Sequence, residues 1–444
     1  MKRIRKFSDI MNKEVRDFSM YTIEDRALPN MIDGLKPVQR FFLYSVLKNA
    51  KNTFNKVASL GGVVSEFGYH HAETACQDAG ALMANTWSNN FPIIQGRGNF
   101  GTRIVPKASA ARYIYATLHE NFRKTYLDEA LSPKHWDLEH IPPRMYLPII
   151  PTVLLNGVEG IAVAYSTDIL PHDPKSVVEC VKSVLETGKC VEPKLKFPEF
   201  NGKIIKDETE DGKYILEGLY EYDEKRKTKL LITEIPPKYD REKYVSVLDD
   251  LVDKNKIVSY TADCRNGFKF DVTLKRDLAI DMTEHDEVIK LFKLSQSVTQ
   301  NITLIGPNRS RNVTDVRIYD NAHTLIKDFV EHRLTYYPIR IANTIAELEE
   351  KVRYANARIK FIELVVSNEI DPRGKTRKQT LTQIETYEYL KEFSEKLISM
   401  NIYHITSDEI KKLEKDLQVI EKELKYWKKT TPKAEYLRDL ENIS

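Results

Sequence analysis

The spacing of apolar residues divides the chain into three stretches of different texture. In the first stretch, apolar side chains recur at steps of three and four from Phe7 to Tyr21, which predicts a helix that packs through one face. Short helical patterns separated by glycine-containing turns then run from Arg26 to about Trp136. These patterns predict a compact, helix-rich domain over residues 1–144.

Between about 145 and 325 the pattern changes to β-branched and aromatic runs that are broken by turns. Examples are YLPIIPTVLLNG, KYILEGLYEYD, KLLITEIPPKYD and GFKFDVTL. Such runs are typical of strands that alternate with helices. They predict a mixed α/β domain over residues 145–325.

The last stretch, residues 326–444, has the heptad-like spacing of long helices. Apolar residues from Leu334 to Val366 follow steps of seven and then alternating steps of four and three, and a return run from Ile410 to Trp427 repeats this spacing. We expect the two runs to pair as a long antiparallel coiled coil with a small dimerising globule between them. An ordinary helical bundle without an oligomeric role is the alternative.

The composition is that of a globular protein. Of 444 residues, 41% are hydrophobic and 30% charged, which excludes a disordered chain. No apolar run approaches the roughly 20 residues that cross a bilayer, and the first residues lack the apolar core of a signal peptide. The four cysteines show no zinc-ligand spacing. We therefore expect a cytoplasmic protein with reduced thiols, no disulfide framework and no membrane partner.

Charge is distributed unevenly along the chain. Residues 1–123 carry 17 Lys and Arg against 10 Asp and Glu, a net charge of +7, which leaves −4 for the remainder. The amino-terminal part is therefore the better candidate to bind a polyanion, although a basic surface is more often simply solvated.

Two phosphate-binding motifs fail on inspection. Gly96–Gly101 satisfies GxGxxG, but the strand-like Thr102–Pro106 follows where the motif needs a helix. Gly374-Lys375-Thr376 resembles the end of a phosphate loop, but Glu369 stands where that loop requires glycine. No Asp-x-Asp pair or spaced histidine set marks a metal site. The sequence thus predicts neither an ATP site nor a metal site on this chain.

The segment KASAARYIYATLHENFRK, residues 107–124, carries candidate chemistry in its Arg112-Tyr113 pair. A deprotonated phenol can attack a phosphodiester, and an adjacent guanidinium can neutralise the charge of the transition state. A tyrosine ester conserves the phosphodiester energy, so the break is reversible without ATP. By itself the pair is weak evidence, because the chain has 23 tyrosines and most tyrosines pack.

The surrounding segments strengthen this interpretation. They resemble, in order and spacing, the breakage–reunion subunit of type IIA topoisomerases, the family that includes the gyrase A subunit, and look most like its bacteriophage members. The resemblance covers nearly the whole chain and rests on RALPNMIDGLKPVQRFFLY (26–44), EFGYHHAETACQDA (66–79), QGRGNFGT (95–102), ASAARYIYATL (108–118) and PTVLLNGVEGIAVAYSTDILPH (151–172).

The resemblance implies catalytic roles. Tyr113 is similar to the nucleophile that becomes linked to the 5′ phosphate, and Arg112 to its transition-state partner. Tyr115 is a rival nucleophile without a preceding arginine. His70 is similar to a group that hydrogen-bonds the reacting phosphate, although this chain reads YHHAET where the family has YHPHGD. Arg26, at the head of RALP, resembles a residue near the scissile phosphate.

The resemblance also implies DNA-binding positions. Lys36 and Arg40 are expected to contact the phosphate backbone, which gives salt-dependent affinity without reading sequence. Thr74 and Asp78 fall where the family places its quinolone-contacting serine and acid. Ile169 resembles the apolar side chain that wedges between base pairs and bends the DNA. For each of these residues, an ordinary surface or core position is the alternative.

Together these features imply the DNA-gate subunit of an ATP-dependent type II topoisomerase. The expected fold is mixed α/β and multidomain: a winged-helix-type domain with Tyr113, an α/β tower domain and the coiled coil. Two copies are expected to pair about a two-fold axis on double-stranded DNA. A partner subunit is expected to supply the ATPase and the ligands for Mg²⁺.

Because the chain stops at Ser444, soon after the coiled coil, we expect relaxation or decatenation rather than active supercoiling. A DNA-bending scaffold in which Tyr113 merely packs is the competing function. A tyrosine recombinase or relaxase is remote, since the chain lacks HxxR and His-hydrophobic-His motifs.

Overall fold

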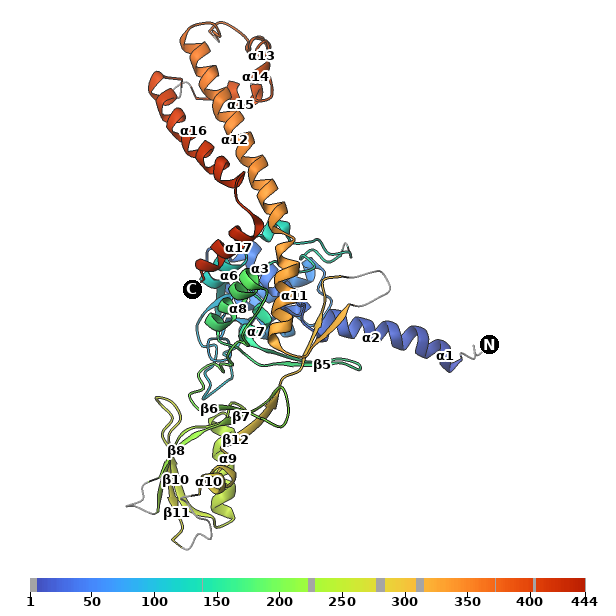
Figure 1. Cartoon of the computed structure of the whole chain (residues 1–444), viewed down its shortest axis with the longest axis vertical. Coiled ribbons are helices and arrows are strands. Elements are labelled where there is room, and N and C mark those ends of the chain that lie inside the picture. Colours follow the sequence, from blue (N-terminus) through green and yellow to red (C-terminus); the bar gives the residue numbers. More distant parts are fainter. Residues whose placement is uncertain are drawn as a thin grey trace. The chain divides into compact units, whose positions relative to one another are not determined.

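The computed structural model describes residues 6–137, 139–222, 228–276, 284–308, 315–371, 373–401 and 405–443. Two compact units divide the chain: Met1–Arg333 with Asp439–Ser444, and Leu334–Arg438. The first unit contains both strands and helices, whereas the described part of the second is helical, so the mixed α/β class is confirmed (Figure 1). The expected division at residues 144 and 325 stays a prediction.

The amino-terminal residues form one continuous helical run, as the spacing predicts. Its segments are α1 (Phe7–Asp9), η1 (Ile10–Val15), α2 (Arg16–Thr22) and η2 (Ile23–Ala27), of which η1 and η2 are π-helical. The expectation that its apolar face packs is wrong within this chain. Phe7 is 75% exposed and Phe18 61%.

Residues 37–131 form a helix-rich domain around a small antiparallel sheet with the strand order β1-β3-β2. A Cβ at Gly80 would lie 2.3 Å from the Phe42 ring, so glycine allows α3 and α5 to cross closely. The elements are α3 (Pro37–Asn49), β1 (Asn55–Lys56), α4 (Val57–Gly62), η3 (Val63–Phe67), α5 (Glu73–Ala84), β2 (Ile94–Arg97), β3 (Tyr115–Leu118), α6 (Glu120–Thr125) and η4 (Glu129–Leu131).

Two hairpins adjoin this domain. Their strands are β4 (Val158–Ile161) with β5 (Ser166–Ile169), and β13 (Ile302–Ile305) with β14 (Val316–Tyr319). Three helices accompany them: α7 (Thr152–Asn156), α8 (Pro174–Thr187) and α11 (Ala322–Leu334).

One cysteine expectation needs correction. Cys180 of α8 is disulfide-bonded to Cys190, with the two Cα atoms 5.1 Å apart. Sequence spacing alone gave no sign of this pair. The helix α8 ends at Thr187, and the chain turns at Gly188, which has a left-handed backbone conformation. Cys76 and Cys264 are free and buried, in agreement with the expectation of reduced thiols.

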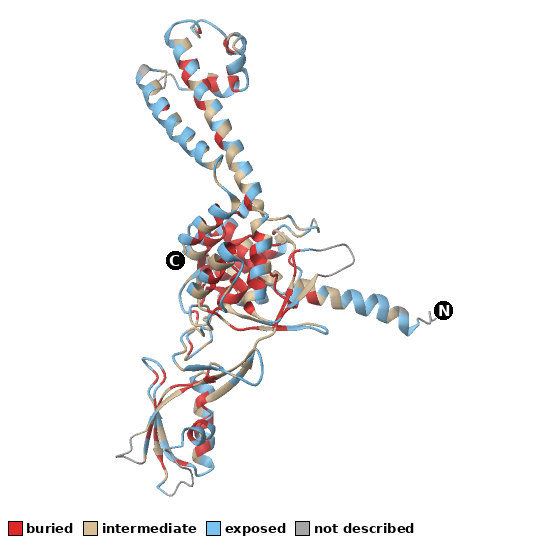
Figure 2. Cartoon of the chain, viewed as in Figure 1, coloured by how far each residue is buried: buried red, intermediate tan, exposed pale blue. Residues whose placement is uncertain are grey.

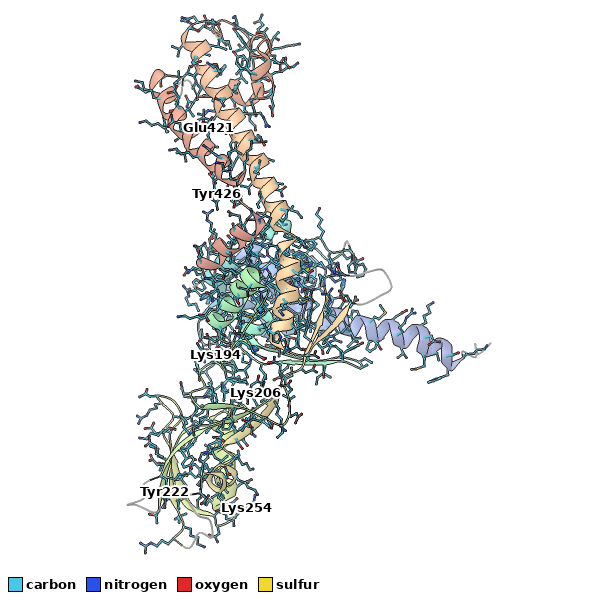
Figure 3. The ribbon with its side chains drawn as sticks, viewed as in Figure 1. Lys194, Lys206, Tyr222, Lys254, Glu421 and Tyr426 are labelled. Carbon is cyan, nitrogen blue, oxygen red and sulfur yellow. A yellow bond between two sulfur atoms is a disulfide. The ribbon has the colours of Figure 1, made fainter. Side chains whose placement is uncertain are left out.

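The residues described between 199 and 299 form an outer lobe with two antiparallel sheets, ordered β10-β11-β9-β8 and β12-β7-β6. Tyr244, Leu248, Phe270 and Phe292 lie in its buried core. Lys206, labelled in Figure 3, belongs to edge strand β6, whose residues are all exposed. The elements are β6 (Lys203–Lys206), β7 (Lys213–Glu217), β8 (Leu219–Tyr222), β9 (Lys229–Glu234), α9 (Arg241–Asp253), β10 (Ile257–Ala262), β11 (Phe270–Leu274), α10 (His285–Leu291) and β12 (Ser295–Thr299).

The second unit pairs two long helices, α12 (Tyr337–Val366) and α16 (Ser407–Trp427). They run antiparallel, because Arg358 lies 3.6 Å from Glu409 whereas Glu349, earlier in α12, lies 2.6 Å from Lys428 just after α16. The remaining helices within this unit are α13 (Arg377–Glu385), α14 (Glu388–Lys391) and α15 (Ser394–Ile398). Figure 2 shows buried residues along α12 and among the short helices α13 to α15, between α12 and α16 in the chain. The division of the chain after Arg438 falls within the last helix, α17 (Pro432–Glu441).

Within the described residues, no helix combines the length and apolarity that a bilayer crossing needs.

A buried aspartate joins the start of α3 to a distant segment. Asp33 is fully buried, and its carboxylate accepts hydrogen bonds from Nε and Nη2 of Arg40 at 2.8 and 2.9 Å. The same carboxylate accepts the backbone N–H groups of Leu35 and Tyr146, each at 3.0 Å. Four donors therefore depend on one side chain.

Replacing Asp33 with alanine should lower the free energy of unfolding by about 3–5 kcal/mol, because it leaves a buried guanidinium without its counter-ion. Urea denaturation of the purified chain measures this change. The control is Asp17→Ala, which breaks the exposed pair with Arg16 and should cost at most about 1 kcal/mol. Equal effects of the two substitutions would contradict the assignment.

Candidate active site

Tyr113 lies in an exposed turn directly before strand β3. Its backbone N–H donates to Ala110 O at 2.9 Å, and the side chain is 64% exposed. The Arg112 guanidinium carbon lies 4.7 Å from the centre of the Tyr113 ring. A phenol and a permanent cation are thus presented together at the surface, where a phosphodiester can reach both.

The turn is anchored on both sides. Ile114 O accepts the N–H of Val57 at 3.0 Å, and Ala111 O accepts the N–H of Ala58 at 3.1 Å, which ties the turn to the start of α4. Ser109 N–H donates to Asn99 O at 3.0 Å. The backbone under Tyr113 is therefore fixed although its side chain is exposed.

Tyr115, the rival nucleophile, has a different environment. It lies within β3, paired with Lys56 on one side and Arg97 on the other. The Arg97 guanidinium carbon lies 5.3 Å from the Tyr115 ring centre and 5.0 Å from that of Phe54. Tyr115 is only partly exposed and is packed under a cation, so the geometry favours Tyr113.

A cavity of about 130 Å³ lies between α2 and the turn after η3. Its lining includes the imidazoles of His70, His71, His135 and His140. His70 Nε2 lies 3.5 Å from Glu139 Oε2, and both side chains are largely exposed. Tyr21 Oη lies within hydrogen-bond distance of His71 Nε2, at 2.7 Å. Burial lowers the pKa of His71, and electrostatic interactions with Arg26 and His70 lower it further. The lowered pKa favours the neutral form of the His71 imidazole.

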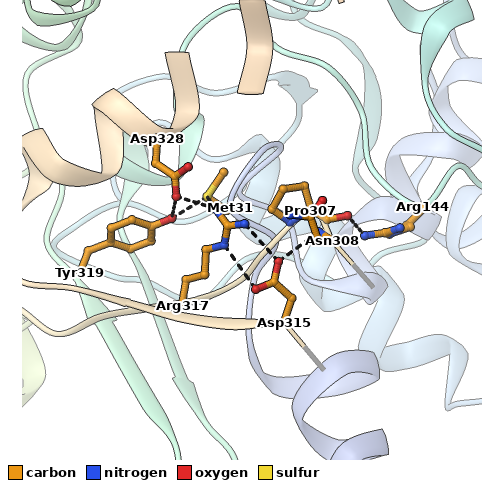
Figure 4. A network of polar contacts seen from close by, with 8 residues as sticks. All are labelled: Met31, Arg144, Pro307, Asn308, Asp315, Arg317, Tyr319 and Asp328. Carbon is orange, nitrogen blue, oxygen red and sulfur yellow. Dashed lines mark hydrogen bonds and ion pairs between the residues drawn. The ribbon is translucent and has the colours of Figure 1, made fainter. Parts of the chain in front are cut away.

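A polar network holds the segment after Arg26 in place (Figure 4). Arg317 Nη1 donates to Asp328 at 2.6 Å, and its other nitrogens donate to Asp315 at 3.3 Å. Tyr319 donates to the same Asp328 carboxylate, and its hydroxyl lies 2.7 Å from Met31 Sδ. This network joins hairpin β13–β14 to α11 through Asp328 and to the segment after Arg26 through Met31.

Backbone bonds support the same junction. Met31 N–H donates to Ile305 O at 2.8 Å, and Ile305 N–H donates to Pro29 O at 3.0 Å. The segment after the exposed Arg26 is therefore fixed, because Asn30 and Ile305 form a parallel β-bridge.

Lys36 and Asp78 line a groove of about 940 Å³. Lys36 Nζ donates to Glu159 O at 2.6 Å, and burial lowers the pKa of its ammonium despite the opposing charge of Glu159. Thr74 and Asp78 are both exposed, four residues apart on α5, so they share one face of that helix. The groove and this helix face offer a surface for an extended ligand.

Two expectations about DNA contacts need correction. Arg40 is only 9% exposed and is committed to Asp33 and to Leu35 O, so it is a core residue and not a backbone contact. Ile169 is 2% exposed at the end of β5, so it cannot insert between bases. Ile161, across the same hairpin, is 88% exposed. Sequence reasoning chose the wrong isoleucine because both lie in apolar runs.

The single chain brings together some predicted residues and separates others. Arg112 stacks on Tyr113, while the charge of Arg26 acts on His71 and helps to lower its pKa. Within the described residues, no hydrogen bond, ion pair or ring contact joins Tyr113 to His70 or Arg26. Tyr21 and Glu139, which contact the histidines, were missed, since neither belongs to a motif.

The described residues hold no cluster of metal-binding side chains. Among the described residues, no set of three or more His, Cys, Asp or Glu side chains could hold a metal ion. The described residues therefore offer no cage made of protein ligands alone, whereas Mg²⁺ at phosphate sites is usually held by one or two carboxylates together with waters and phosphate oxygens.

Comparison with known proteins shows which family this chain resembles. The family model that describes the A subunits of DNA gyrase and topoisomerase IV matches residues 26–442. The chain is 46% identical to the DNA topoisomerase medium subunit of Enterobacteria phage T4, over 99% of both chains. It is 28% identical to DNA topoisomerase 2 of Plasmodium falciparum over 98% of this chain, but spans only 34% of that protein.

A solved structure agrees. The Plasmodium falciparum topoisomerase II DNA-binding, cleavage and re-ligation domain matches with a TM-score of 0.87 at 28% identity, over 98% of this chain and 63% of that chain. The resemblance inferred from the motifs is confirmed. The chain therefore belongs to the family of DNA gyrase and topoisomerase IV A subunits, whose members are subunits of type II DNA topoisomerases.

Proposed function

We propose that this chain is the DNA-cleaving and rejoining subunit of an ATP-dependent type II topoisomerase, with Tyr113 as the nucleophile. The observation that carries the proposal is the exposed Tyr113 phenol under the Arg112 guanidinium, on a fixed backbone turn. Its family membership supplies the class of reaction.

In the proposed step, Tyr113 loses its phenolic proton and its oxygen attacks the phosphorus. A phosphotyrosyl bond forms to the 5′ phosphate, and the bond from phosphorus to the 3′ oxygen breaks. The departing 3′ oxygen takes up a proton. Arg112 stabilises the charge of the transition state, and reversal of the same step reseals the strand without a nucleotide cofactor.

His70 and Arg26 are proposed to bind the reacting phosphate, although neither contacts Tyr113 within the described residues of one chain. Bound DNA, or the second copy in a two-fold dimer, brings the two groups together. Two copies also supply one tyrosine for each strand. The small sheet with α3–α5 is then a winged-helix-type domain, and the paired helices α12 and α16 lead to a dimerising end as a coiled coil.

A partner subunit is proposed to carry the ATPase and the Mg²⁺ ligands. What supports a partner is the family membership and the 46% identity to a phage T4 protein named as a medium subunit, a name that implies further subunits. Lys36, Thr74 and Asp78 are proposed to contact double-stranded DNA along the groove and the α5 face.

Ile161 replaces Ile169 as the proposed wedge. A β-branched side chain that is 88% exposed at the end of β4 can insert between base pairs, where the cost of unstacking is offset by the extra surface that bent DNA wraps.

Tyr113→Phe should abolish the covalent adduct between protein and cut DNA, because phenylalanine has no oxygen nucleophile. The measurement mixes the chain with its partner subunit, Mg²⁺ and supercoiled plasmid, and adds detergent to trap adducts. Tyr115→Phe is the matched control and should retain them. Loss with Tyr115→Phe alone would shift the assignment by two residues, and tight binding without any adduct would favour the scaffold function.

Arg112→Lys should slow adduct formation by about 10²–10³-fold, because lysine lacks the planar guanidinium that neutralises the transition state. Single-turnover cleavage measures this rate. Lys56→Arg, on the neighbouring strand β1, should leave it within about twofold. A wild-type rate for Arg112→Lys would remove Arg112 from the mechanism.

Ile161→Ala should reduce DNA bending and weaken binding about tenfold, or ~1.4 kcal/mol. Energy transfer between dyes at the two ends of a short duplex reports the bend. Val191→Ala is the control, since Val191 is 83% exposed but lies outside the hairpin. A full bend with Ile161→Ala would exclude the wedge.

A further inference from the structure

The loop that precedes Tyr113 is folded tightly back on itself. Asn99 O accepts the N–H of Ser109 at 3.0 Å, which closes the base of the loop four residues before the nucleophile. Gly101 has φ +81, and a Cβ there would lie 2.4 Å from Pro106 O. Thr102 N–H donates to Val105 O at 2.9 Å, which closes the tip as a tight turn.

Arg103, at that tip, is inserted into the outer lobe and is only 7% exposed. Its Nη1 donates to Glu234 Oε1 at 2.6 Å and to Glu199 O at 2.9 Å, and its Nη2 donates to Ile235 O. Glu234 itself is 3% exposed, so the ion pair is almost fully removed from water.

Aromatic rings and a second anchor complete the insertion. The Arg103 guanidinium carbon lies 5.4 Å from the Phe200 ring centre and 4.9 Å from that of Phe268. Ile104 packs against the core of the lobe, and its O accepts the N–H of Arg241 at 3.2 Å. The loop is thereby attached to the lobe through two adjacent residues, Arg103 and Ile104.

The Glu234 carboxylate is bound on both of its oxygens. Its Oε2 accepts the N–H of Asn201 at 3.0 Å, and its Oε1 accepts the N–H of Ile235 at 2.9 Å in addition to Arg103. A lysine could keep the charge of Arg103 but not its planar fork and its contact with two rings. The site is therefore built for arginine.

The outer lobe also carries a hollow of about 340 Å³ whose lining includes three lysines, Lys238, Lys290 and Lys293, and one carboxylate, Asp286. Burial and the charge of Lys293 lower the pKa of Lys238, as expected where ammonium groups crowd together. A surface with this excess of positive charge favours the phosphate backbone of DNA beyond the cleavage site.

We propose that Arg103 is a positioning residue that couples the outer lobe to Tyr113, so that DNA held by the lobe sets the position of the nucleophile. The inference rests on the proposed function of Tyr113. Arg103 does not touch the reacting atoms: it acts through Glu234 on one side and through the closed loop on the other. Loss of the clamp should misplace Tyr113 without removing a DNA contact.

The test compares Arg103→Lys and Glu234→Gln with the wild-type chain in the complete enzyme. Three quantities are measured for each variant: affinity for a short duplex, the bend of that duplex from dye-to-dye energy transfer, and the single-turnover rate of adduct formation. Arg265→Lys is the matched control, because Arg265 is an exposed arginine of the same lobe, 2.8 Å from Asp263.

Both variants should bind within about twofold of wild type and keep the bend, while adduct formation falls about tenfold or more. A wild-type rate of adduct formation in both variants would overturn the inference. A parallel fall of affinity, bend and rate would also overturn it, because it would reveal a merely structural role. A wild-type enzyme that forms no adduct would instead overturn the proposed function of Tyr113 and this inference with it.

Discussion

The buried ion pair between Asp33 and Arg40 is the interaction on which the Arg26–Lys36 side of the candidate active site depends. The carboxylate binds the guanidinium through two hydrogen bonds and also binds two backbone N–H groups, and Asp33 O accepts the Thr152 hydroxyl at 2.7 Å. A buried charge of this kind is tolerated only when every donor is satisfied. The turn between Arg26 and Lys36 is thus fixed from inside, while those two cations face outward or into the groove.

A second buried ion pair holds the other half of the site. Arg103 and Glu234 clamp the loop before Tyr113 to the outer lobe, just as Asp33 and Arg40 hold the segment after Arg26. Both pairs use the bidentate or forked geometry of arginine, which fixes direction as well as distance. The reactive side chains themselves are exposed, so rigidity comes from their supports and accessibility from their own positions.

The sequence predicted the type of fold better than it predicted burial. The spacing from Phe7 to Tyr21 correctly indicated a helix, but periodicity cannot tell whether an apolar face finds a partner in the same chain. For the same reason Ile169 was chosen over Ile161: both are isoleucines in apolar runs, and only the hairpin register places one in the core. Arg40 resembled a phosphate contact because the sequence does not show that the chain turns between Asp33 and α3 and so places the carboxylate against the guanidinium. Arg103 escaped notice because its partner is 131 residues distant in the sequence.

The most direct test of the account is to identify the side chain that becomes linked to DNA. Adducts formed by the complete enzyme are trapped with detergent, digested with nuclease and protease, and the peptide from residues 108–123 is fragmented in a mass spectrometer. The account predicts a nucleotide on the oxygen of Tyr113, joined through a 5′ phosphate. A nucleotide on Tyr115, or no modified tyrosine in adducts that resist detergent, would contradict it.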